Sequence, residues 1–362
     1  MAVLKSILRI IMPSLLPSLA LSSCYSDFDP NIDSTPVLCI NATVEAGEPL
    51  KVEVTHTWRW EESDLIDKNG AEVTDATVKL YVNDNYVEDL TCREVERDPN
   101  QSYLVPQFRY LYFSDKYIPA SGDVVRLEAE SEQYGGASAT ETIPHAVGID
   151  RVESTLSDVH VYSNSNGGID CTFDLSMLIY FTDPADVRNF YQFNMGAWNP
   201  YMYDNETSEV CYFMYNMWDV DMTGEPLFTE HVSTLESIVA ETWGYSFFSD
   251  RQISGKTYPL HVKINDCSLT YYNPENKPDY ENAGLEFELM SLSQSYYNHV
   301  LSVWEANDGI VGSLGSVGLG EAVPPYSNVS SHAGIVAGCA GSKVRLSIPL
   351  ILKEYLDLKT QQ

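Results

Sequence analysis

The chain has 362 residues, with 21 Lys or Arg against 52 Asp or Glu, and its formal net charge at pH 7 is −31. This length is sufficient for two domains with separate hydrophobic cores. So acidic a surface repels nucleic acid and anionic lipid headgroups, which excludes both as expected ligands.

The first 23 residues are predicted to be a secretory signal peptide. Lys5 and Arg9 are its only charged residues, and its short apolar run is interrupted by Pro13 and Pro17. A basic start, a short apolar middle and small residues before a cleavage site are typical of such peptides. The run is too short and too broken to span a bilayer.

The end of this segment, the sequence LSSC at residues 21–24, resembles the lipobox of bacterial lipoproteins. An aliphatic residue and two small residues precede Cys24, whose thiol is the nucleophile that accepts a diacylglycerol. Cleavage would make lipidated Cys24 the first residue of the mature chain, and several acyl chains anchor a protein far more firmly than one. The alternative is ordinary cleavage, with Cys24 as an incidental thiol.

Residues 24–35 are predicted to form an acidic tether between the anchor and the first strand. The segment is polar and contains Asp27, Asp29, Pro30 and Asp33. No later hydrophobic run has spanning length, so the mature chain is expected to be soluble apart from its lipid anchor.

Residues 36–145 are predicted to form an immunoglobulin-like β-sandwich. Apolar and polar residues alternate in four segments, at residues 38–44, 50–54, 76–82 and 125–129. Such alternation indicates strands with one buried face, and the turn between the first two segments predicts a hairpin. Short strands divided by turn residues are typical of sandwiches.

Residues 146–362 are predicted to form a second, mostly β domain, which makes the fold class all-β. Strand patterns occur at residues 171–181, 258–264 and 285–289. One short helix is predicted near 294–306, where Ser293 is a suitable N-cap and apolar side chains follow at helical spacing. A glycine-rich stretch, GSLGSVGLGE at residues 312–321, lacks the Gly-Lys-Ser/Thr of a phosphate-binding loop and is interpreted as a surface loop.

Six cysteines remain if Cys24 carries lipid: Cys39, Cys92, Cys171, Cys211, Cys267 and Cys339. Six thiols can pair in fifteen ways, and the sequence does not choose among them. Their wide spacing, without C-x-x-C, disfavours metal clusters and redox motifs. Cys39 and Cys171 lie within strand patterns, where buried free thiols are expected.

The segment DVDMTGEPLFTE, residues 219–230, partly matches a calcium-binding loop, with matching residues Asp219, Asp221, Thr223, Gly224 and Glu230. The flanking segments have strand character rather than helical character, and Pro226 occupies a position where the loop needs a backbone N–H. A hairpin turn is therefore the favoured interpretation. The seven histidines form no metal-binding pair, so no metal, cofactor or catalytic residue is predicted.

Aromatic residues crowd the segment 190–220. They are expected to be mostly core residues, but the segment is also the leading candidate for a partner or ligand surface, because tyrosine and tryptophan combine apolar faces with a polar edge. The candidates for such a surface are Tyr191, Phe193, Trp198, Tyr201, Tyr203, Tyr212 and Trp218.

Six stretches, taken in order, resemble the Bacteroidota lipoproteins grouped as domain of unknown function 4249. They are NATVEAGEPLKVEVTHT, VTDATVKLYVND, FTDPADVRNFYQF, FFSDRQISGKTYPLHV, LMSLSQSYYNHVLSVWE and PPYSNVSSHAGIVAG. The resemblance covers nearly the whole mature chain. The last stretch departs somewhat, because the family has a more glycine-rich version there.

The resemblance implies an outer-membrane lipoprotein, often encoded beside TonB-dependent receptors, with no established enzymatic activity and therefore no catalytic residues to transfer. Asp27 and Asp29 are similar to the acidic surface-export signal that follows the lipidated cysteine in these bacteria. The leading functional hypothesis is an accessory or docking subunit of a TonB-dependent transport system. The alternatives are a free-standing surface protein that binds a glycan or peptide, and a hydrolase with a buried carboxylate pair.

Overall fold

The computed structural model describes residues 35–58, 70–96, 108–163, 168–204, 209–215, 220–222, 225–229, 246–272, 283–307 and 324–359. Most of these residues lie in strands, which confirms the all-β fold class. The signal peptide at 1–23, Cys24 and nearly all of the tether lie outside the described residues. Within the described part of the chain, no helix combines the length and the apolarity needed to cross a membrane.

The first lobe is a β-sandwich built mainly from the N-terminal strands. These are β1 (Leu38–Glu45), β2 (Lys51–His56), β3 (Thr77–Val82), β4 (Asn85–Asp89), β5 (Thr91–Glu96), β6 (Phe108–Phe113), β7 (Val124–Ser131) and β8 (Gly135–Thr142). A four-stranded sheet, β4-β3-β7-β8, packs against β1 and β2. The predicted hairpin is confirmed, because β1 and β2 pair antiparallel with Ile40 opposite Val54.

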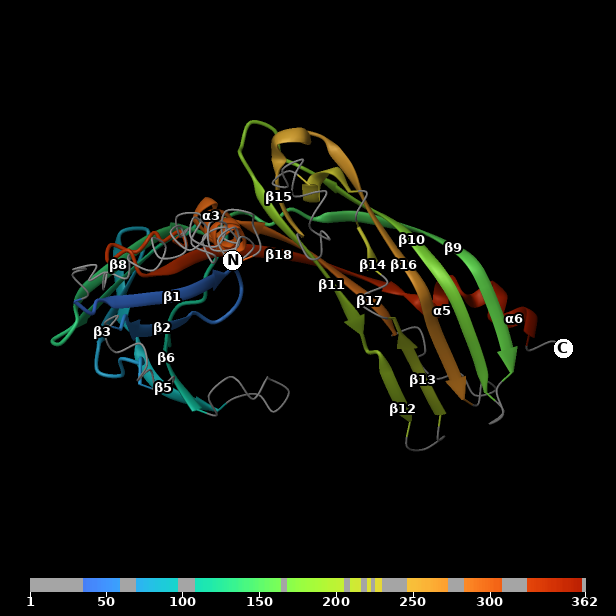
Figure 1. Cartoon of the computed structure of the whole chain (residues 1–362), viewed down its shortest axis with the longest axis horizontal. Helices are drawn as coiled ribbons and strands as arrows, with labels where there is room; N and C mark the ends of the chain where they lie inside the picture. Colours follow the sequence, from blue (N-terminus) through green and yellow to red (C-terminus); the bar gives the residue numbers. More distant parts are fainter. Residues whose placement is uncertain are drawn as a thin grey trace, which may run out of the picture.

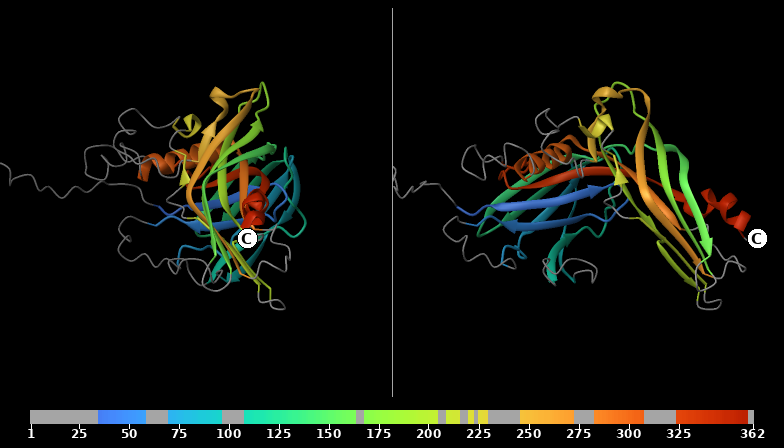
Figure 2. Two further views of the ribbon diagram at one scale, coloured as in Figure 1. Left: turned by 90° about the vertical axis from the view of Figure 1, so that its right-hand side faces the viewer. Right: turned by 45° about the vertical axis from the view of Figure 1, so that its right-hand side comes forward.

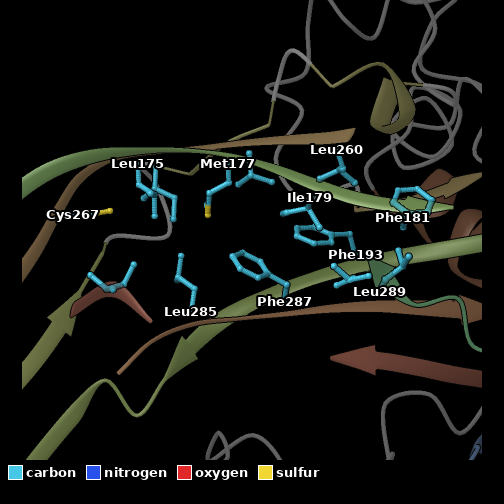
Figure 3. Close-up of a cluster of buried hydrophobic side chains, with 14 of the residues drawn as sticks. Leu175, Met177, Ile179, Phe181, Phe193, Leu260, Cys267, Leu285, Phe287 and Leu289 are labelled. Atoms are coloured by element: carbon cyan, nitrogen blue, oxygen red, sulfur yellow. The ribbon is translucent and has the colours of Figure 1, made fainter. Parts of the chain in front are cut away.

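The second lobe contains longer strands. The elements after β8 are β9 (Ile149–Ser163), β10 (Ile169–Thr182), β11 (Phe190–Trp198), β12 (Tyr201–Asp204), β13 (Glu209–Met214), β14 (Val220–Asp221), η3 (Pro226–Thr229), β15 (Phe247–Ser249), η4 (Asp250–Gln252), β16 (Thr257–Tyr272), β17 (Gly284–Leu292), α3 (Gln294–Asn307), β18 (Gly334–Ser347), α5 (Ile348–Ile351) and α6 (Lys353–Lys359). Figure 3 shows the core of this lobe, in which side chains from β10 and β16 face side chains from β11 and β17.

One sheet belongs to both lobes. Its strand order is β15-β11-β17-β18-β1-β2-β6-β5. Strand β18 joins the two parts, because its first half pairs parallel with β1 while Cys339–Ser347 pair antiparallel with β17. Figure 1 shows β18 running from one lobe into the other. Near the predicted boundary at residue 145, Ile143 belongs to the first core and Val147 to the second, and the segment after 328 returns to the first core through Val329 and Val336.

The long sheet of the second lobe has β-bulges on both sides of β10, two of them close together. Asp158 in β9 has φ 51° and Asp266 in β16 has φ 53°. The pairing register of β10 with each of these strands shifts beside Asp174. Because a bulge adds a residue to one strand and increases its local bend and twist, adjacent bulges curve neighbouring strands together. Figures 1 and 2 show β9, β10 and β16 curving side by side.

The helix predicted near 294–306 is confirmed as α3. The Ser293 hydroxyl accepts a hydrogen bond from the Tyr296 N–H at 3.2 Å, which is the predicted N-cap. Tyr297 and Trp304 are buried, and they pack in one cluster with residues of β11, β17 and β18. The helix therefore covers one end of the shared sheet on the side away from the second-lobe core.

The five cysteines whose side chains are described, Cys39, Cys92, Cys171, Cys267 and Cys339, are all free thiols. Burial raises the pKa of Cys171 to about 11, which agrees with its predicted place in the core. Cys39 is only partly buried, in contrast to its prediction. The structure describes no side chain for Cys211, which lies in β13.

Candidate functional site

Two of the aromatic residues predicted as a ligand surface are core residues, and that prediction is wrong for them. Tyr191 has no exposed area, and Phe193 is 2% exposed. Both point toward the second-lobe core, where the Phe193 ring stacks on Phe287 with centroids 6.3 Å apart. Strand β11 carries buried residues on both faces at this end, because α3 covers the opposite side over Phe190. Neither residue is accessible to a ligand.

Of the other predicted aromatics, Trp198 and Tyr201 lie on either side of the connection between β11 and β12. Trp198 is half-buried at the end of β11, and the Arg345 guanidinium lies 4.7 Å from its ring centroid. Tyr201 is 64% exposed. Tyr203 and Tyr212 lie in β12 and β13, where the structure describes no side chains for them, and Trp218 lies outside the described residues.

The partial calcium loop is only partly described. Asp221 lies in β14 opposite Lys263 of β16, whereas Asp219, Thr223, Gly224 and Glu230 lie outside the described residues. The flank at Leu227–Thr229 was interpreted as strand, but it belongs to η3, where Leu227 and Phe228 are buried. In the described ranges, no three His, Cys, Asp or Glu side chains are grouped so that they could hold a metal ion.

The solvent side of the sheet β12-β13-β16-β10-β9 brings separate aromatic residues into register. We call this surface the outer face; on β10 it consists of the residues that alternate with the buried ones. One row of backbone partners crosses all five strands near the lobe tip, and in order it is Tyr201, Tyr212, Thr270, Asp170 and Tyr162. Of its aromatic residues, Tyr201 and Tyr162 have described side chains, and both are exposed. Tyr162 is 48% exposed. Tyr162 is not among the predicted surface residues, because it lies in β9, far in sequence from the aromatic segment.

The middle of the outer face is hollowed into a groove of about 560 Å³. We call it the outer groove; its main lining residues are Glu153, Thr155, Ser176, Leu178, His261 and Lys263, with Asp221 at one side. This volume is within the range of small-molecule sites. None of these residues was a sequence candidate except Asp221, because the groove forms only when three strands lie side by side.

One wall of the outer groove carries a carboxylate in a fixed orientation. Glu153 accepts hydrogen bonds from Arg151 Nε at 3.0 Å and from the Tyr180 hydroxyl at 3.1 Å. The guanidinium of Arg151 also lies 3.6 Å from the ring centroid of Tyr180. The hydrogen bond from Arg151 lowers the pKa of Glu153, so this carboxylate is ionised at neutral pH.

A second carboxylate at the groove, that of Glu225, is already occupied by the protein itself. It is 1% exposed and accepts hydrogen bonds from the Tyr258 hydroxyl at 2.6 Å and from the backbone N–H of His261 at 2.9 Å. A third comes from the Leu227 N–H at 3.2 Å. Burial, with the hydrogen bond to Glu225, raises the pKa of Tyr258. The hydrogen bonds of Glu225 therefore hold η3 against the edge of β16.

A buried carboxylate pair, the feature expected of the hydrolase alternative, is present but is enclosed. Asp183 is 1% exposed and Asp250 is 5% exposed. Asp183 accepts hydrogen bonds from the Tyr191 hydroxyl at 2.5 Å, the Gly255 N–H at 3.1 Å and Asn189 Nδ2 at 3.3 Å. Asp250 accepts from the Asn189 N–H at 2.9 Å. The hydrogen bonds of the two carboxylates hold the turn after β10 against the segment after β15. Neither carboxylate lines the outer groove.

Comparison of the sequence with protein-family models finds no match, and comparison with curated proteins also finds none. Four of the six sequence stretches quoted above supply side chains that hydrogen-bond separate segments together. Asp183 and Asp250 come from two of them, and Ser293 caps α3 from a third. In a fourth, Asn328 exchanges two hydrogen bonds with the backbone of Val336, at 2.8 and 3.0 Å.

Proposed function

We propose that this protein is a non-enzymatic lipoprotein of the outer membrane that serves as an accessory or docking subunit of a TonB-dependent transport system. The lipobox-like sequence before Cys24 and the family resemblance support the location and the partner. The structural observation that carries the proposal is the shared eight-stranded sheet, which unites the two lobes. A continuous sheet gives an anchored protein a stiff body, and anchoring raises its effective concentration at a membrane partner.

The partner is tested by purification of the full-length protein in mild detergent through a tag placed after Gln362. A β-barrel receptor is expected to co-purify in a defined ratio. A matched preparation from cells that express the tag on an unrelated lipoprotein controls for nonspecific capture of abundant barrels. Repeated recovery of the protein alone, from cells that express the receptor, would contradict the docking role.

The anchor is tested by Cys24→Ala. This variant is expected to move almost completely from the membrane fraction to the soluble fraction, because it lacks the thiol that accepts the lipid. Fractionation followed by immunoblotting measures the shift. Cys92→Ala is the matched control, since Cys92 is a free thiol in β5, and it should stay with the membrane. A Cys24→Ala protein that remains membrane-bound refutes lipidation at this residue.

A second candidate function, a free-standing surface protein that binds a glycan or peptide, is favoured by one observation. The outer groove and the exposed Tyr162 and Tyr201 lie on the same face of one sheet. Both features face solvent and together offer polar groups and aromatic rings. Binding by the mature protein would be lost when this face is altered.

A further inference from the structure

The floor of the outer groove offers side chains rather than backbone to a ligand. Two cross-strand rows form it: Glu153, Leu178 and His261 in one, and Thr155, Ser176 and Lys263 in the other. Each row spans two strand spacings, about 10 Å. The central strand β10 is paired along this stretch with β9 on one side and β16 on the other, so its backbone groups are engaged in the sheet. A peptide lying on the floor over β10 therefore cannot bind by adding a strand to β10.

The charged groups of the groove are mixed in sign. Glu153 is paired with Arg151, and the carboxylate of Glu225 accepts three hydrogen bonds from the protein. Lys263 lies opposite Asp221 in the register of β14 and β16. The carboxylates would repel an anionic ligand, and Lys263 and Arg151 would repel a strongly cationic one. Electrostatics therefore favour a neutral ligand.

The remaining groups suit a ligand rich in hydroxyls. Lys263 and the hydroxyls of Thr155 and Ser176 are hydrogen-bond donors, while Glu153 is an oriented acceptor. A sugar hydroxyl both donates and accepts, so one ring can satisfy groups of both kinds. Leu178, at the centre of the floor, offers a small apolar area to the C–H face of a ring.

We infer that the outer groove binds a neutral oligosaccharide. This inference rests on the second proposed function and names its site and ligand class. Lys263 and His261 hold the hydroxyls of one sugar unit, and Leu178 packs against its ring. Longer chains extend along β10 toward Tyr162 and Tyr201, which lie on the same face near the lobe tip.

The test is calorimetric titration of the full mature protein with short neutral oligosaccharides of glucose, mannose or xylose. Lys263→Ala and His261→Ala are each expected to weaken binding about tenfold, because each variant lacks one side chain that hydrogen-bonds to a sugar hydroxyl. Both side chains are exposed, so the fold should survive, and circular dichroism checks this. Lys51→Ala, an exposed lysine on β2 in the other lobe, is the matched control and should bind normally.

The outcomes separate the site from the function. Binding that is unchanged by the groove variants but lost in Tyr201→Ala overturns the groove as the site and leaves a glycan-binding function in place. The same titration is run with an acidic oligosaccharide and with a short peptide, and tighter binding of either one overturns the ligand class. If no member of the panel binds the parent protein, both the inference and the glycan form of the second proposed function fail.

Discussion

Asp183→Ala is expected to remove about 2–6 kcal/mol from the free energy of unfolding. The substitution leaves three donors without their acceptor: the Tyr191 hydroxyl, the Gly255 N–H and the Asn189 amide. Tyr191 has no exposed area, so water cannot replace the lost partner. The buried Tyr191 hydroxyl left unsatisfied costs about 1–3 kcal/mol, and each of the two hydrogen bonds from the more exposed Gly255 and Asn189 contributes about 0.5–1.5 kcal/mol. The total is a large part of the stability of an ordinary domain.

Urea unfolding followed by tryptophan fluorescence measures this loss. Asp150→Ala is the matched control, because Asp150 is exposed and accepts one hydrogen bond, from the Thr182 hydroxyl at 2.8 Å. The control should change stability by less than about 0.5 kcal/mol. Equal losses in the two variants would show that Asp183 does not fasten the turn after β10.

The pH dependence of Asp183→Asn gives a separate check. Burial raises the pKa of Asp183, and the hydrogen bonds from Tyr191 and Gly255 oppose that rise. Since the folded-state pKa is above the unfolded-state value, ionised Asp183 costs stability above the folded-state pKa, and the cost is relieved as the pH falls through it. Asparagine does not titrate. The stability advantage of the parent over Asp183→Asn should therefore widen as the pH is lowered.

Gly334→Ala is expected to cost about 3–5 kcal/mol, because backbone strain and a steric clash act together. Gly334 has φ +89°, and a Cβ there would lie 2.3 Å from the carbonyl oxygen of Ile40. That atom belongs to the backbone of β1, which is fixed by pairing with β18 and β2. The clash can be relieved only by moving β18 away from β1, which loosens the connection between the lobes.

Gly47→Ala is the control that separates the cost of the backbone conformation from the cost of the steric clash. Gly47 has φ +88°, nearly the same as Gly334, but a Cβ there meets nothing within 4 Å. This control should lose only the cost of the left-handed backbone, about 1–2 kcal/mol. Thermal unfolding of both variants measures the difference. If Gly334→Ala is no less stable than Gly47→Ala, the close approach of β18 to β1 is not what requires glycine.

The local parts of the fold could be predicted from the sequence. Alternation at 38–44 and 171–181 predicted β1 and β10 because side chains in a strand point alternately to the two faces. The start of α3 could be predicted from Ser293, because an N-cap side chain binds a backbone N–H only two or three residues further along the chain. The candidate surface was predicted less well: Tyr201 is exposed, whereas Tyr191 and Phe193 are in the core.

Only the tertiary structure decided which residues meet. Alternation shows that a strand has a buried face, but it does not show that α3 covers the other face of β11. The parallel pairing of Ile40 with Gly334 joins residues far apart in the chain, and no local pattern marks it. The outer groove and the Asp183 contacts likewise gather residues from several strands. The sequence alone thus predicted several of the strands and the capped helix, because these depend on near neighbours. The shared sheet and the groove depend on strand order, which long-range packing sets.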